Sequence, residues 1–122
     1  MNKNIDKEEL ELGQRIFQSA LRVNSALTEI SIILHNKEQI YTDSYYNVIS
    51  EIRAFNDTFF KINNKNDIKF KPVFWFELYE EITILSKYIE SAKIKKNKVI
   101  FSDEVAKILY EVWFNFNRRL TL

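Results

Sequence analysis

The chain has 122 residues, a length that suits one compact domain spanning residues 1–122 with a single hydrophobic core. Eighteen Lys and Arg residues face 17 Asp and Glu residues, so the overall charge gives no argument for a nucleic-acid or membrane-surface partner. The chain has no Cys and one Gly, which excludes disulfides, Cys-based zinc sites, a Cys nucleophile and glycine-rich phosphate loops.

The first predicted helix covers residues 6–36. Asp6 suits its cap position, and the glutamates that follow suit the positive end of the helix dipole. Apolar residues recur alternately three and four positions apart, which places them on one helix face. These residues are Gly13, Ile16, Ala20, Val23, Leu27, Ile30 and Leu34.

The second predicted helix covers residues 42–63. It carries the same alternating spacing from Tyr45 to Ile62. A polar cluster at residues 63–67, typical of a loop, follows it.

The third predicted helix covers residues 72–94. Pro72 suits a first helical turn, where its missing N–H has no intrahelical partner in any case. The apolar seam of this helix runs from Trp75 to Ala92, and the lysine-rich residues 93–98 suit its negative end.

The fourth predicted helix covers residues 103–120, with Ser102 as its cap. The apolar residues 99–101 before it are expected to pack under the bundle or to form a brief extended piece. The predicted seam consists of Val105, Leu109, Val112, Phe116 and Leu120.

These four segments predict an all-α, single-domain antiparallel helical bundle with up-down-up-down order, because the connections are short. A three-helix core with the last helix packed elsewhere is the alternative. Residues 1–14 lack the apolar stretch of a signal peptide, and the run Ile30–Leu34 is far shorter than the roughly 18 apolar residues of a spanning helix. We therefore expect a cytoplasmic protein without a membrane partner.

The sequence contains no recognisable catalytic or metal-binding pattern. His35 is the only histidine, and no second His stands at a metal-ligand spacing, so it is interpreted as a polar residue at a helix end. Glu77, Glu80 and Glu81 share one turn and are interpreted as a solvated helix face. We predict no enzyme activity, no catalytic residue, no cofactor and no metal ion.

Aromatic residues exceed what one helix stripe can bury. Residues 73–76 occupy nearly the whole circumference of the third helix, and Trp113 and Phe114 fall beside the seam of the fourth. In an up-down-up-down bundle the two groups are expected to meet at one end, either as an aromatic end of the core or as a partner surface. Trp75 is expected in the core and Trp113 as an exposed anchor. The predicted partner-binding residues are Phe74, Phe76, Trp113, Phe114, Arg118 and Arg119.

Lysines cluster in two loops that antiparallel topology places at opposite ends of the bundle, which argues against one continuous phosphate-binding stripe. The first loop carries Lys61, Lys65, Lys69 and Lys71, and the second carries Lys93, Lys95, Lys96 and Lys98. We expect a small non-enzymatic protein-binding protein of the inhibitor, immunity or regulatory-adaptor type, with a second copy of the chain as one candidate partner. The alternative is a nucleic-acid-associated accessory protein that uses the lysine-rich loops.

Overall fold

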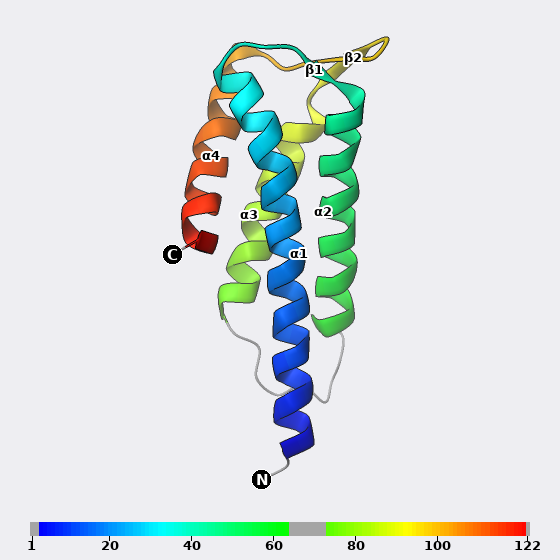
Figure 1. The fold of residues 1–122 in the computed structure, drawn as a ribbon, viewed down its shortest axis with the longest axis vertical. Helices are drawn as coiled ribbons and strands as arrows, with labels where there is room; N and C mark the ends of the chain where they lie inside the picture. Colours follow the sequence, from blue (N-terminus) through cyan, green and yellow to red (C-terminus); the bar gives the residue numbers. More distant parts are fainter. Residues whose placement is uncertain (1–2, 64–72, 122) are drawn as a thin grey trace.

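The computed structural model describes residues 3–63 and 73–121, with the side chains of residues 3–6, 8, 9, 62, 63 and 73–75 outside the description. These ranges contain four helices, α1 (Lys3–His35), α2 (Thr42–Asn63), α3 (Val73–Glu90) and α4 (Asp103–Thr121). They also contain three short strands, β1 (Ile40–Tyr41), β2 (Lys93–Lys95) and β3 (Lys98–Ile100). The predicted all-α helical bundle is confirmed (Figure 1).

The helices form a ring in which α1 packs against α2 and α4, and α3 packs against the same two helices. In Figure 1, α1 and α3 rise from the lower end to the upper end, whereas α2 and α4 descend. Because α4 contributes four residues to the common core, the alternative with a three-helix core is wrong. The largest fully buried side chains, drawn from all four helices and from β1, include Ile16, Leu27, Ile30, Ile40, Phe55, Leu78, Ile82, Leu85, Leu109 and Phe116.

Helix α1 begins at Lys3, so the predicted start at residue 6 is wrong and Asp6 lies within the helix and not at its cap. The helix ends at His35, one residue before the predicted end. The N–H of Glu38 donates to the carbonyl of Ile33, and the N–H of Lys37 donates to the carbonyl of Leu34, each at 3.0 Å. Lys37 adopts a positive φ of 57°, the left-handed conformation that closes such a helix end. These bonds satisfy carbonyls that the helix itself leaves without partners.

Helix α3 ends at Glu90, so the predicted end at residue 94 is wrong. Residues 93–95 pair instead with residues 98–100 in an antiparallel hairpin, and β3 also pairs with β1. Ile40 and Val99 are register partners and both are buried. The brief extended piece expected at residues 99–101 is thus confirmed, and burial of Val99 holds the hairpin against the upper end of the bundle.

Helix α4 begins where the sequence predicts. The backbone N–H of Val105 donates to Ser102 Oγ at 3.1 Å, and the N–H of Ala106 donates to the Ser102 carbonyl at 2.9 Å. Ser102 therefore caps α4 as predicted, and Asp103 and Glu104 occupy the acidic first turn.

Candidate partner-binding surface

The outward side of α4 carries two of the predicted partner-binding residues. Phe114 is 52% exposed, and Arg118 is exposed one helical turn further along. A spacing of four residues places both side chains on one helix face. The structure therefore brings an exposed aromatic ring and an exposed guanidinium together on one surface.

The prediction that Trp113 is an exposed anchor is wrong. The residue is only 9% exposed, and its indole N–H donates to Thr28 Oγ1 on α1 at 2.7 Å. Its ring also lies 5.5 Å from Tyr110 and 6.4 Å from Phe114. The buried stripe of α4 shares Leu109, Phe116 and Leu120 with the predicted seam, but Trp113 takes the place predicted for Val112.

Two polar side chains of α1 join α4 at this seam, and sequence reasoning missed both. Asn24 is buried and donates through Nδ2 to Asn117 Oδ1 at 2.8 Å. Thr28, which accepts the indole N–H of Trp113, donates in turn to the carbonyl of Asn24 at 2.7 Å. Asn24 lies one turn before Thr28, so the only sequence signal for this contact with α4 was a pair of polar residues at helical spacing.

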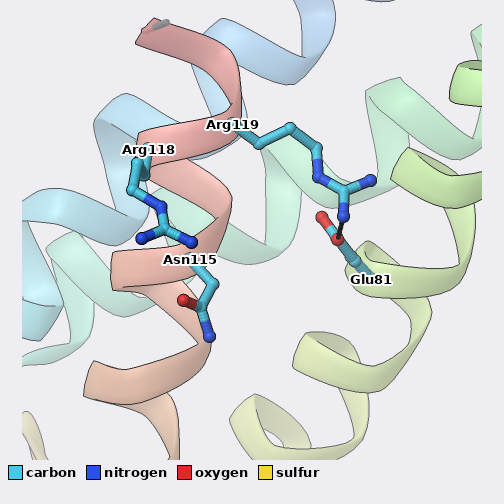
Figure 2. Close-up of a pocket in the computed structure, with 4 residues that line it drawn as sticks. All are labelled: Glu81, Asn115, Arg118 and Arg119. Atoms are coloured by element: carbon cyan, nitrogen blue, oxygen red, sulfur yellow. Dashed lines mark ion pairs between the residues drawn. The ribbon is translucent and has the colours of Figure 1, made fainter.

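Arg119 is bound within the chain. Its Nη1 lies 2.7 Å from Glu77 Oε2 and its Nη2 lies 3.0 Å from Glu81 Oε1. The clustered glutamates interpreted as a solvated face therefore include two that tie α3 to α4. Figure 2 shows Glu81 directed from α3 toward the Arg119 guanidinium.

Glu81 is partly buried beside this ion pair, and its Oε2 is buried with no hydrogen-bond partner among the described residues. Burial raises the pKa of the Glu81 carboxyl above its ordinary value; Arg119 acts against this increase, and the negative charge of Glu77 adds to it. The cost of desolvation therefore outweighs the attraction of the guanidinium at this position.

A pocket of about 520 Å³ opens between α3 and α4 at this point (Figure 2). All of its lining side chains are polar: Glu81, Asn115, Arg118 and Arg119. This pocket and the neighbouring Phe114 form the surface that we call the α4 surface, comprising Glu81, Phe114, Asn115, Arg118 and Arg119.

Phe76 lies apart from the α4 surface. Its ring packs edge-on against Phe59 of α2 at 5.5 Å, and Phe59 stacks on Tyr79 at 4.4 Å. Trp113, which contacts α1 through Thr28, instead lies near the rings of Tyr110 and Phe114 within α4. Among the described rings, the two aromatic groups therefore do not form the expected single end; the side chains of Phe74 and Trp75 lie outside the described residues.

A second pocket, of about 510 Å³, lies where the end of α1 meets the start of α4. The His35 ring stacks on Tyr110 there, with centroids 4.2 Å apart. Lys37, Lys107, Asp103 and Glu111 also line this pocket. Because both charge signs line it, the pocket has no single electrostatic preference.

No family model matches the chain, and no curated protein or solved structure is significantly similar to it. Within residues 3–63 and 73–121, no helix combines the length and the apolar character needed to cross a membrane. The described side chains contain no group of three or more His, Cys, Asp or Glu residues placed to hold a metal ion. The case for function therefore depends on the chemistry of the α4 surface.

Proposed function

We propose that this chain is a non-enzymatic cytoplasmic protein that binds another protein through its α4 surface, in the manner of an inhibitor, an immunity protein or a regulatory adaptor. The observation that carries the proposal is the half-exposed Phe114 ring one turn from the exposed Arg118. Aromatic residues and arginine dominate the binding energy of protein interfaces.

The buried seam behind this surface supports the proposal. Trp113 packs beneath Phe114, and its hydrogen bond to Thr28 fixes the indole in place. The contact side chains therefore project from a rigid helix rather than from a loop, and little ordering entropy would be lost on binding. Within this proposal Trp113 supports the surface, Phe114 and Arg118 contact the partner, and Phe76 lies outside the contact area.

The partner is either a different protein or a second copy of this chain. Two copies related by a two-fold axis would place one Phe114 against the other without any further sequence feature. Analytical ultracentrifugation of the purified chain, over a range of concentrations, distinguishes a monomer from a dimer.

The test of the proposal compares Phe114→Ser with a matched control, Phe60→Ser, which changes another exposed aromatic residue on the far helix α2. We expect Phe114→Ser, and not Phe60→Ser, to abolish association. The association measured is that of the chain with itself or with a partner co-purified from the source cells. Both variants should keep the helical circular-dichroism signal. Equal association by the wild type and Phe114→Ser would remove the proposal.

A nucleic-acid-associated role is the second candidate, because Lys93, Lys95, Lys96 and Lys98 are all exposed on the hairpin of β2 and β3. Phosphate contacts would make binding fall steeply with salt. A salt titration of binding to a labelled duplex and to a single strand tests this role. Residues 64–72, which carry most of the other lysine-rich loop, lie outside the described residues. Within the described part of the chain the hairpin offers one short basic segment at one end of the bundle, so we favour protein binding.

A further inference from the structure

The pocket in the α4 surface has an asymmetric set of polar groups. Asn115, Arg118 and Arg119 come from consecutive turns of α4, and Glu81 faces them from α3. Spacings of three and four residues place the three α4 side chains on neighbouring positions of one face. Figure 2 shows the Arg118 guanidinium beside the Asn115 amide, with Arg119 and Glu81 on the opposite wall.

The two arginines differ in their available hydrogen-bonding capacity. Arg119 is shared between Glu77 and Glu81, so its charge is already compensated within the chain. Arg118 is exposed and forms no ion pair with any acidic residue in the described part of the chain. A guanidinium carries five N–H donors and binds carboxylates through two parallel hydrogen bonds. Arg118 is therefore the group that can bind an additional anion by donating hydrogen bonds to it.

The charge on Glu81 limits which anion fits. Its carboxylate lines the same pocket and is only partly offset by Arg119, so a further negative charge in the pocket meets some repulsion. A carboxylate carries one negative charge, whereas a phosphorylated side chain carries up to two at neutral pH. The pocket is thus better suited to a carboxylate than to a phosphate.

We infer that this pocket receives an acidic side chain of the partner protein, whose carboxylate is held by Arg118 and the Asn115 amide while a neighbouring apolar residue covers Phe114. The inference rests on the proposed function and adds the chemistry of the partner. The partner is accordingly a protein with an Asp or Glu next to an apolar residue on its contact surface. Charge complementarity would then set the orientation of the complex, and burial of Phe114 would supply affinity.

The test uses the whole chain, isotope-labelled for NMR, and three capped octapeptides as probes. The peptides differ only at one central position, which is glutamate, glutamine or phosphoserine, and each carries an adjacent leucine. We expect the glutamate peptide to shift the side-chain signals of Asn115 and Arg118, and the glutamine peptide to bind at least about tenfold more weakly. Arg118→Gln should weaken the binding of the glutamate peptide by a similar factor.

Arg22→Gln is the matched control, because it removes another exposed arginine, which lies on α1, and it should leave the affinity unchanged. Equal binding of the glutamate and glutamine peptides overturns the inference, as does tighter binding of the phosphoserine peptide. The absence of any shift at Asn115 and Arg118 at millimolar peptide overturns it as well.

The same variants separate this inference from the proposed function. If Phe114→Ser abolishes association and Arg118→Gln does not, the α4 surface binds a partner without an acidic anchor, and only the inference fails. If neither variant changes association, the proposed function itself fails.

Discussion

The two sides of α4 are joined to the rest of the bundle by different chemistry. On the side of α1, the contacts are neutral and largely buried: Asn117 accepts from Asn24, and Trp113 donates to Thr28. On the side of α3, an exposed arginine pairs with two glutamates. Neutral buried hydrogen bonds are insensitive to salt, whereas exposed ion pairs are weakened by salt and by a change in pH. The contacts between α4 and α1 should therefore respond little to salt, whereas the ion pairs between α4 and α3 should weaken as salt is added.

Truncation of Trp113 should give the largest loss of stability, because this side chain lies on the buried side of α4. We expect Trp113→Ala to lower the free energy of unfolding by about 3 to 5 kcal/mol through loss of buried aromatic area and a cavity. Phe114→Ala is the control one residue along, and its half-exposed ring should cost within about 0.5 kcal/mol. Urea denaturation measures both values. Similar costs for the two variants would contradict the contrast between the two sides.

Removal of the hydroxyl that receives the indole N–H should give a smaller effect. Thr28→Val leaves the Trp113 N–H without its partner, and we expect a cost of about 1 to 3 kcal/mol.

Thr58→Val is a close control for this change. Thr58 is also half-buried and also donates to the carbonyl four residues earlier, at 3.0 Å, but this hydrogen bond lies exposed on α2. The difference between the two Thr→Val costs, measured by chemical denaturation, reports the contact with Trp113. If this difference is zero, the hydrogen bond between Trp113 and Thr28 contributes nothing to the stability of the fold.

The smallest effect concerns pH at the α3 side. Because burial raises the pKa of Glu81, the folded chain holds this proton more strongly than the unfolded chain does. The resulting stabilisation is complete below the ordinary pKa of a glutamate and is lost as the pH rises through the folded value. The stability of the wild type relative to Glu81→Gln should therefore fall by under about 1 kcal/mol between roughly pH 4 and pH 7.

Two further variants, measured at the same two pH values, sharpen this result. Glu80→Gln shows how the removal of a nearby exposed charge changes the free energy of unfolding. The free-energy cost of Thr28→Val should be the same at both pH values. A relative stability of the wild type that rises toward neutral pH would mean that Arg119 outweighs burial at Glu81.

Most of the helical architecture follows from local pattern. The predicted starts and ends of the second and fourth helices differ from the structure by at most one residue, because caps and polar loops mark them. The end of α3 was mispredicted because lysine and isoleucine at residues 93–95 are compatible with a helix. Pairing with residues 98–100 decides their conformation.

The candidate site was only partly accessible to sequence reasoning. Phe114 and Arg118 were among the predicted partner-binding residues, and both are exposed. The burial of Trp113 was missed because Val112 and Trp113 both lie three or four residues from Leu109 and Phe116, so either can complete the stripe. The hydrogen-bond partner of Trp113, which favours its burial, lies 85 residues away in the sequence. The pairing of Arg119 likewise depends on the side-by-side packing of α3 and α4, which no local pattern contains.

Strand β2 lies at an edge of the sheet, since the strand order is β1-β3-β2. An open edge can recruit a strand from another molecule and begin aggregation. Antiparallel pairing of two such edges centred on Ile94 would place Lys93 of one copy opposite Lys95 of the other, and like charges in facing positions oppose the pairing. The charges of the hairpin lysines therefore oppose edge-to-edge pairing of two copies through β2.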